Sequence, residues 1–392
     1  MNVLMISDVY FPRVNGVSTS IETFRNELLR KNAGVTVIAP AYGKDERKEG
    51  VIRIPSRGVM FDPEDRMMAY GAIMAQADLL REQNFDLVHI QTPFVAHYAG
   101  IALAKELNLP TVVTYHTFFE EYLFHYIPFL PAEWMRGLAR RFSRKQCNDV
   151  DAVVVPSTAM ARTLADYGVK KPLHIIPTGI PGEMFVKGNG EAFRELHGIA
   201  QSTPVMLFVG RVAFEKNIEF LLHAANIARK TIPELLLIIA GEGPAAKSIG
   251  KLVKSLQLEN NVKLIGYMDR ERLLRDCYSA ADVFVFASRT ETQGLVLLEA
   301  MAAGLPVIST AHMGTRDILK PNSGSVVPDD DPQSFAGEMV RVLSDGEFRQ
   351  ELSVQACNYA EKWSAAAMAE KMMDLYGEMI AKSSIGAAIA VR

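Results

Sequence analysis

The sequence contains little cysteine, no long apolar run and no excess of positive charge, and each absence excludes a class of protein. Its three cysteines, Cys147, Cys277 and Cys357, are far apart and lack metal-ligand or redox spacing, so we expect free thiols in a reducing cytoplasm. No apolar run reaches the length of about 20 residues that a membrane-spanning helix needs. The formal net charge of -3 excludes a generally basic nucleic-acid-binding protein.

The first residues, MNVLMISDVYFP, lack the basic start of a secretory signal and are typical of a first β-strand that leads into a loop. We therefore expect a cytoplasmic protein that is soluble or lies on a membrane surface.

Short apolar runs alternate with longer helical patterns, which predicts an α/β fold with parallel sheets. A chain of 392 residues is long enough for two such domains. The expected strands are 2–6, 35–39, 87–91, 111–115 and 152–155, then 205–209, 235–240, 262–266, 283–287 and 307–309. Helices are expected between them, including 18–31, 67–83 and 95–107.

The pattern breaks over residues 172–190, which contain a HIIPTGIPGE stretch. We place the domain boundary there and predict domains 1–180 and 181–362, with a C-terminal helix at 363–392 that returns to the first domain. Ligands of doubly wound sheets bind beyond the carboxyl ends of the strands. That rule selects a set of residues in each half: Asp8, 91–93, His116 and 156–157, then 210–211, Gly241, 266–267 and Glu291.

The stretch RTETQGLVLLEAMAAGLPVIS carries two glutamates, Glu291 and Glu299, eight positions apart. On one continuous helix they would be rotated by roughly 80° and would not share a face. If Glu291 lies in a loop ending at Gly294, residues 295–303 can form a buried helix that Gly304 ends. The carboxylates then lie near a helix N-terminus, where anions such as phosphate bind, which suggests a polyhydroxylated ligand that carries phosphate.

Two cations follow the strand at 205–209. Arg211 and Lys216 lie in one short loop before a helix, where they suit a diphosphate. A solvated basic loop is an equal alternative on this fragment alone.

Gly16, beside Asn15 and Ser18, allows a close backbone approach to phosphate, although a plain capped turn is at least as common.

Two histidines differ in their position. His116 follows a strand end, where it can hydrogen-bond substrate hydroxyls or move protons, whereas His97 lies within a helical pattern and is interpreted as structural. The acidic run DDDP is interpreted as an N-cap by Asp331, and no metal is proposed.

The segment WMRGLARRFSRKQ is basic and amphipathic. Its cations are Arg136, Arg140, Arg141, Arg144 and Lys145, and Trp134, Leu138 and Phe142 form another stripe. Such a helix can lie in an anionic membrane interface, or it can pack its apolar stripe on its own domain.

Taken in order, the glycine loop at Gly16, the IPTGI hinge, the GR…KN loop at 210–217 and the E-x7-E stretch from Glu291 to Glu299 resemble a retaining glycosyltransferase of family 4. The resemblance covers nearly the whole chain. It implies the GT-B fold, in which two Rossmann-like doubly wound domains face a central cleft, the first binding the acceptor and the second the nucleotide-sugar. It also implies no cofactor, because the UDP- or GDP-linked sugar is a substrate.

The resemblance implies a role for each matching residue. Glu299 matches the glutamate that holds ribose, and Glu291 matches the one against the donor sugar. Arg211 and Lys216 match the pair on the diphosphate, Gly16 the glycine that closes on it, and His116 a histidine near the reacting carbon. The donor is further held by the position that recognises the base and by a backbone loop: Tyr267, then Thr292, Gln293, Gly294 and Leu295.

The segment TYHTFFEEYLFHYIP is similar to the acceptor-domain loop of bacterial enzymes that glycosylate diacylglycerol. With the basic segment, it favours a lipid acceptor at the inner face of the plasma membrane. Transfer to a soluble sugar or glycan precursor is the alternative, and a GT-B nucleotide-sugar epimerase is a weaker one. The identity of the donor base and sugar stays open.

Overall fold

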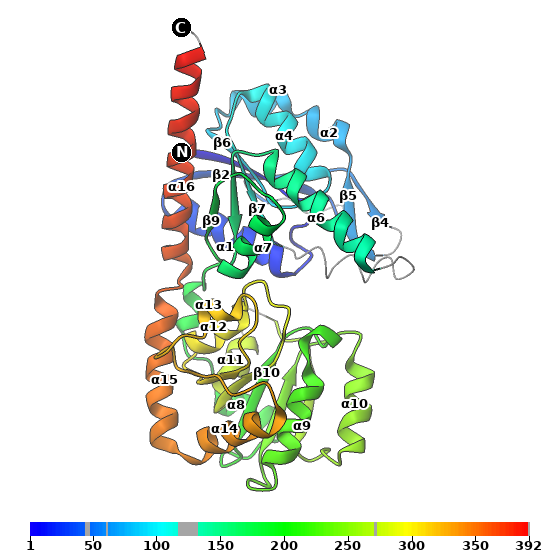
Figure 1. Cartoon of the computed structure of the whole chain (residues 1–392), viewed down its shortest axis with the longest axis vertical. Coiled ribbons are helices and arrows are strands. Elements are labelled where there is room, and N and C mark those ends of the chain that lie inside the picture. Colours follow the sequence, from blue (N-terminus) through cyan, green and yellow to red (C-terminus); the bar gives the residue numbers. More distant parts are fainter. Residues whose placement is uncertain (44–47, 60–61, 117–131, 270–272, 391–392) are drawn as a thin grey trace. The chain divides into compact units, whose positions relative to one another are not determined.

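In the computed structural model the chain divides into two compact units (Figure 1). Unit 1 comprises residues 1–179 and 365–392, and unit 2 comprises residues 180–364. The structure describes residues 1–43, 48–59, 62–116, 132–269 and 273–390.

A seven-stranded parallel sheet forms the centre of unit 1, in the order β3-β2-β1-β6-β7-β8-β9. Its strands are β1 (Asn2–Ile6), β2 (Gly34–Pro40), β3 (Val51–Ile54), β6 (Leu87–Ile90), β7 (Thr111–Thr114), β8 (Ala152–Val155) and β9 (Leu173–Ile175). A separate antiparallel hairpin joins β4 (Ser56–Val59) and β5 (Asp62–Met68). The helices are α1 (Gly16–Arg30), α2 (Tyr70–Met74), α3 (Ala77–Glu82), α4 (Val95–Leu107), α6 (Ala132–Asn148), α7 (Thr158–Asp166) and α16 (Ala365–Ala390).

Helices cover both faces of this sheet, which is why its central strands are continuous apolar runs. On one face Val3 and Met5 of β1 share a core with Phe24 of α1 and Met372 of α16. On the other face a Cβ at Gly100 of α4 would lie 2.7 Å from Ile90, so that only glycine lets α4 approach the sheet this closely. The C-terminal helix is therefore part of the core of unit 1.

A six-stranded parallel sheet forms the centre of unit 2, in the order β12-β11-β10-β13-β14-β15. Its strands are β10 (Val205–Val209), β11 (Leu236–Ala240), β12 (Val262–Gly266), β13 (Val283–Phe286), β14 (Val307–Ser309) and β15 (Ser325–Val326). The helices are η1 (Gly182–Phe185), α8 (Gly190–Leu196), η2 (Phe214–Lys216), α9 (Ile218–Ala228), α10 (Ala246–Ser255), α11 (Leu273–Ser279), α12 (Leu295–Ala302), α13 (Thr315–Ile318), α14 (Pro332–Ser344) and α15 (Gly346–Glu361).

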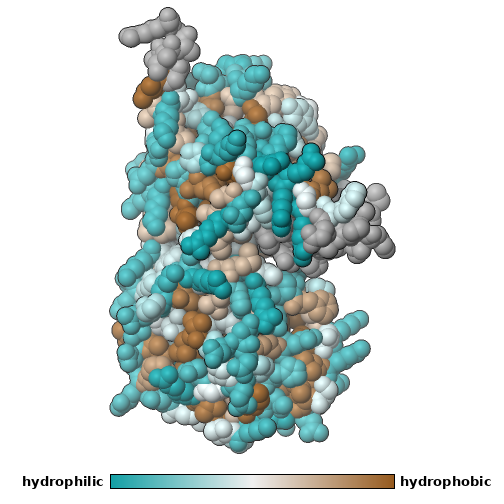
Figure 2. All heavy atoms as spheres, in the orientation of Figure 1, coloured by the Kyte–Doolittle hydropathy of each residue, from teal (hydrophilic) through white to brown (hydrophobic). Residues whose placement is uncertain are grey.

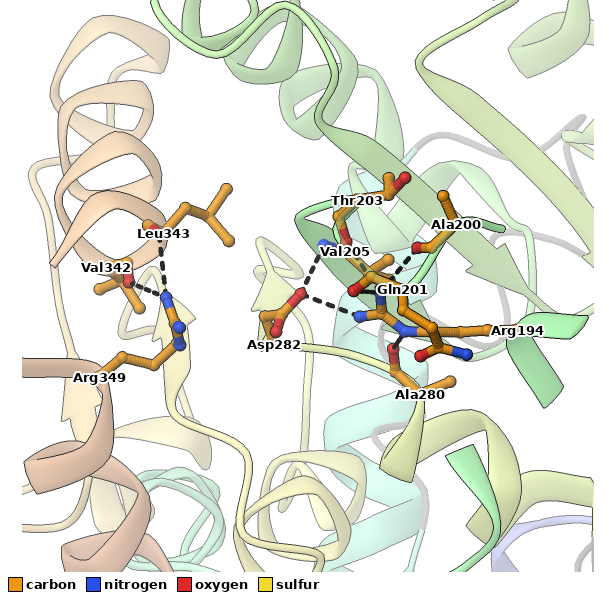
Figure 3. Close-up of polar contacts among 10 residues, drawn as sticks. All are labelled: Arg194, Ala200, Gln201, Thr203, Val205, Ala280, Asp282, Val342, Leu343 and Arg349. Carbon is orange, nitrogen blue, oxygen red and sulfur yellow. Dashed lines mark hydrogen bonds and ion pairs between the residues drawn. The ribbon is translucent and has the colours of Figure 1, made fainter. Parts of the chain in front are cut away.

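A buried arginine of α8 joins this helix to neighbouring segments of unit 2 through hydrogen bonds and an ion pair (Figure 3). The Arg194 guanidinium donates to the carbonyl oxygens of Ala200, Gln201, Thr203 and Ala280 at 2.8–3.2 Å. It also lies 3.1 Å from Asp282, whose carboxylate accepts the backbone N–H of Val205 at the start of β10. The same figure shows Arg349 of α15 donating to the last carbonyls of α14, at Val342 and Leu343. Both arginines satisfy carbonyl groups that would otherwise be left unpaired.

Most of the expected strands are confirmed to within a residue or two, but one expected helix is wrong and some short strands were missed. Residues 67–83 do not form one helix, because Met67 and Met68 pair with Arg57 and Ser56 in the β4–β5 hairpin and the rest forms the short helices α2 and α3. The predicted break at 172–190 contains β9, which adds an edge strand to unit 1.

Two local predictions are confirmed. Helix α12 ends at the C-cap Ala303, and Gly304 follows it with φ of 80°. The Asp331 side chain caps α14 by accepting the backbone N–H groups of Gln333 and Ser334. Both ends therefore follow from capping chemistry that is visible in the sequence.

Within the described ranges, no helix is both long and apolar enough to cross a membrane. The same residues contain no group of three or more His, Cys, Asp or Glu side chains that could hold a metal ion.

Candidate active site

The loops after β10 and β11 in unit 2 pack backbone against backbone. A Cβ at Gly241 would lie 1.9 Å from the carbonyl oxygen of Gly210, and one at Gly243 would lie 2.4 Å from that of Val212. Gly241 also has a φ of 143°, which other residues rarely adopt. These glycines fix the path of the loop that carries Arg211, and the sequence alone had drawn attention to Gly210 and Gly241 but not to Gly243.

The same loop is held to the end of β13 by two side chains. Asn217, with φ of 54°, donates from Nδ2 to the carbonyl oxygen of Ala287 at 3.2 Å, and Ser288 Oγ donates to that of Glu215 at 3.3 Å. Because β10 and β13 are neighbours in the sheet, residues that are 70 and 73 positions apart in the chain meet here.

Lys216 and Glu291 form an ion pair at this point. Lys216 Nζ lies 2.5 Å from Glu291 Oε1, and the two side chains are 22% and 15% exposed. The structure thus joins the cation expected at the diphosphate to the carboxylate expected at the sugar. Arg211, in contrast, is exposed, and so is Tyr267, which follows Gly266 at the end of β12.

The turn from Glu291 to Gly294 leads directly into α12. Its backbone is held by Gly314, whose N–H donates to the Glu291 carbonyl oxygen at 2.9 Å. A Cβ at Gly314 would lie 2.1 Å from the Thr292 carbonyl oxygen, and Gly294 has φ of 93°. The turn therefore depends on glycine at two positions, and it presents Thr292, Gln293, Gly294 and Leu295 at the start of a helix.

Glu299 lies in a different environment from Glu291. Its side chain in α12 is fully buried, and its Oε2 accepts a hydrogen bond from the Tyr278 hydroxyl of α11 at 3.1 Å. Tyr278 is also fully buried. Sequence reasoning missed Tyr278, because nothing in its local pattern shows that its hydroxyl contacts Glu299 of α12.

In unit 1, His116 lies just beyond β7 and interacts with the neighbouring strand. His116 Nε2 is 3.0 Å from Oε1 of Gln91, which follows β6. Burial lowers the pKa of His116 to about 4, so its imidazole is neutral near pH 7.

Asp8 and Asn15 of unit 1 both contribute to the fold. The Asp8 carboxylate accepts hydrogen bonds from Thr92 Oγ1 and from the Ala96 backbone at the start of α4, and burial raises its pKa to about 6. Asn15 caps α1 in a reciprocal box with Ser18. A Cβ at Gly16 would have no atom within 4 Å, so packing does not require glycine there.

Helix α6 carries the basic segment. Arg136, Arg140, Arg141, Arg144 and Lys145 are all exposed. Among the α6 residues whose burial is described, Ala139, Ser143, Gln146 and Cys147 are buried, whereas Trp134 and Leu138 are 80% and 58% exposed. Of the three stripe residues, Trp134 and Leu138 therefore do not pack on their own domain, whereas Phe142 is partly buried. Lys145 pairs with Asp149 at 2.5 Å, and Arg140 lies over the Tyr167 ring.

Mainly hydrophilic atoms cover the face of unit 1 that α6 crosses, with smaller hydrophobic areas between them (Figure 2). Most of the TYHTFFEEYLFHYIP segment, from residue 117 onward, lies outside the described residues.

Known proteins resemble both units. The family described as Glycosyltransferase Family 4 matches residues 14–183, and the family described as Glycosyl transferases group 1 matches residues 189–362. The chain is 34% identical to an alpha-monoglucosyldiacylglycerol synthase of Streptococcus pneumoniae over 79% of this chain and 71% of that protein. It is 30% identical to the synthase of the same name from Acholeplasma laidlawii, over 79% of this chain and 80% of that protein.

The fold has solved counterparts. The structure of HepE from Anabaena in complex with UDP superposes with a TM-score of 0.75 at 16% identity, covering 96% of this chain and all of that one. Taken with the two parallel sheets, these similarities show a GT-B fold with two Rossmann-like units, and the chain belongs to the group 1 glycosyltransferases of family 4.

Proposed function

We propose that the protein transfers a glucosyl residue from a nucleotide-diphosphate sugar to diacylglycerol, with retention of the anomeric configuration and without a metal ion. The observation that carries this proposal is the similarity to two alpha-monoglucosyldiacylglycerol synthases over 79% of the chain. The name of these two enzymes identifies both the sugar and the lipid acceptor.

The geometry of unit 2 supports the donor half of the reaction. As the bond between the anomeric carbon and the diphosphate oxygen breaks, negative charge develops on the diphosphate. Arg211 and Lys216, which follow β10, stabilise this charge together with the backbone N–H groups of residues 292–295 at the start of α12. Glu291 contacts the sugar, and Glu299 the ribose. The resemblance to the family assigns Tyr267 to the base and Gly16 to the diphosphate.

In the transfer step the acceptor hydroxyl oxygen forms a bond to the anomeric carbon on the face that the diphosphate leaves. The hydroxyl proton passes to the departing phosphate oxygen, so charge and atoms balance. His116 lies near the reacting carbon as a neutral hydrogen-bonding group. This assignment makes His116, Glu291, Arg211 and Lys216 the catalytic residues.

The reaction can be tested with purified protein and a panel of donors: UDP-glucose, UDP-galactose and GDP-mannose. Each is incubated with diacylglycerol in vesicles, with a soluble sugar, and with no acceptor. We expect glucosyl-diacylglycerol and little product from the other arms. Product in the soluble-sugar arm alone would replace the lipid acceptor, and an altered donor without acceptor would indicate an epimerase. The Lys216→Ala protein controls for contaminating activity.

We further propose that α6 holds the protein at an anionic membrane surface on its cytoplasmic side. The five exposed cations and the exposed Trp134 and Leu138 support this. Each basic residue near such a surface contributes about 1 kcal/mol, and salt screens the attraction. The exposed aromatic and aliphatic side chains add apolar contact with the lipid.

Replacing Arg140, Arg141 and Arg144 with glutamine should lower binding to anionic vesicles and transfer to embedded diacylglycerol together. Donor binding in solution should not change. The matched control replaces Lys247, Lys251 and Lys254 of α10 with glutamine. These lysines are also exposed, and their replacement removes the same amount of charge from unit 2. Equal vesicle binding by the arginine variant and the parent would contradict the membrane role of α6.

A further inference from the structure

Two cross-strand hydrogen bonds lie one after the other along β6 and β7. His89 Nε2 is 2.7 Å from Thr114 Oγ1, and His116 Nε2 is 3.0 Å from Gln91 Oε1. In the register of this parallel pair, His89 lies opposite Val112. Each bond therefore joins a residue of β6, or of its extension, to a residue of β7, or of its extension, that lies two positions beyond the one opposite. Residues two apart in a strand face the same side, and so the second bond repeats the geometry of the first.

This side of the sheet is held firmly. His89 Nδ1 contacts the Tyr376 hydroxyl of α16 at 2.5 Å, and both side chains are buried. The Gln91 N–H donates to the Ile6 carbonyl oxygen, and the Tyr115 N–H donates to that of Val154. The backbones on either side of the Gln91–His116 contact are thus fixed by the sheet, and the Gln91 side chain is itself 4% exposed.

We propose that Gln91 is a positioning residue that holds His116 in the tautomer with the proton on Nε2. The amide oxygen of Gln91 accepts that proton, so Nδ1 keeps its lone pair and accepts a hydrogen bond from a hydroxyl of the donor sugar. This inference deepens the proposed function and rests on it for the role of His116, but the tautomer itself is a property of the protein alone.

The chemistry of glycosyl transfer gives a reason to fix the tautomer of His116. Breaking the glycosidic bond leaves oxocarbenium-like positive charge on the sugar ring. A neutral imidazole with an available lone pair tolerates that charge, whereas an imidazolium would repel it. Burial keeps the pKa of His116 low, at about 4, and Gln91 selects which nitrogen carries the remaining proton. A neutral histidine is otherwise free to place its proton on either nitrogen.

The tautomer can be read directly by long-range ¹⁵N–¹H NMR of histidine-labelled protein without substrate, with the His116 signal assigned by its loss in His116→Gln. We expect the proton on Nε2 in the parent. A proton on Nδ1 would overturn the inference. Because this readout needs no acceptor, a failure to glucosylate diacylglycerol would refute the proposed function and leave the NMR result valid.

Two substitutions separate positioning from a structural role. Gln91→Met keeps the size but removes the acceptor, and should lower kcat about tenfold while the donor KM changes less than about twofold. Gln91→Glu still accepts the Nε2 proton, so it should retain activity at pH 8. Its carboxylate raises the pKa of His116, so activity should be lost at a higher pH than in the parent as the solution is acidified.

The control is Gln355→Met on α15, which should leave kcat and the pH profile unchanged. Besides a proton on Nδ1, two outcomes of the substitutions would overturn the inference. One is a Gln91→Met enzyme with parental kcat. The other is a Gln91→Glu enzyme that folds but is as impaired as Gln91→Met at every pH.

Discussion

Replacing Glu291 with alanine should tighten the binding of a free nucleoside diphosphate, even though it lowers glycosyl transfer. In the structure the Glu291 carboxylate neutralises Lys216 at 2.5 Å. A diphosphate that binds Lys216 must compete with this internal anion. UDP and GDP carry no sugar, so the proposed contact of Glu291 with the donor sugar does not enter the measurement.

The size of the effect follows from the burial of the pair. At 22% and 15% exposure the two side chains are partly shielded from water, and coupling energies between residues in contact span about 0.5–3 kcal/mol. We take about 1–2 kcal/mol for the competition, which is about five- to thirty-fold in Kd. Lys216→Ala should weaken binding, because it removes the cation and leaves an unpaired carboxylate beside the diphosphate. Adding Glu291→Ala to Lys216→Ala should therefore restore part of the lost affinity.

Isothermal titration of UDP and GDP into the parent, the two single variants and the double variant measures this cycle. The control is Glu338→Ala, which removes a carboxylate paired with Arg341 on α14 and should leave the Kd unchanged. Weaker nucleotide binding by Glu291→Ala, or a double variant no better than Lys216→Ala, would refute the competition between Glu291 and the diphosphate.

Other consequences can be measured independently. Transfer should be unchanged in EDTA, because Arg211 and Lys216 supply the positive charge; a loss restored by Mg²⁺ or Mn²⁺ would contradict this. Glu299→Gln should mainly raise the donor KM, whereas Glu291→Ala should mainly lower kcat, and steady-state kinetics showing the reverse would exchange their roles. Tyr278→Phe, which removes the hydrogen bond to Glu299, should raise the donor KM in the same direction but less. Arg194→Leu should lower the free energy of unfolding by about 3–5 kcal/mol, because it leaves the Asp282 carboxylate and several carbonyls without their partner; denaturant midpoints equal to the parent's would contradict this.

Much of the fold could be predicted because the central strands are continuous apolar runs bounded by glycine and proline. The end of α12 at Gly304 and the cap of α14 at Asp331 followed from local chemistry alone. The prediction of a helix at residues 67–83 was wrong because their apolar spacing fits a helix, whereas Met68 pairs with Ser56 in a hairpin that this spacing does not indicate. Edge strands such as β9 are too short for their periodicity to be distinctive.

In the candidate site, too, some residues could be predicted from the sequence and others could not. The strand-end rule selected His116, Arg211 and Glu291 from sequence order, because residues at the carboxyl ends of parallel strands share one edge. Their partners depend on packing between elements that are distant in the chain. The pairing of Lys216 with Glu291 needs the β10–β13 neighbour relation, and the contact of Gln91 with His116 needs the β6–β7 register. Neither relation has a local signal.

The most direct test of the central claim is the anomeric configuration of the lipid product. The protein is incubated with UDP-glucose and diacylglycerol in anionic vesicles, and the isolated glycolipid is examined by proton NMR, in which the coupling of the anomeric proton distinguishes α from β linkage. A retaining transfer from the α-linked donor predicts α-glucosyl-diacylglycerol. A β-linked glycolipid would contradict the retaining mechanism, and the absence of any glycolipid from every donor tested would contradict the lipid acceptor.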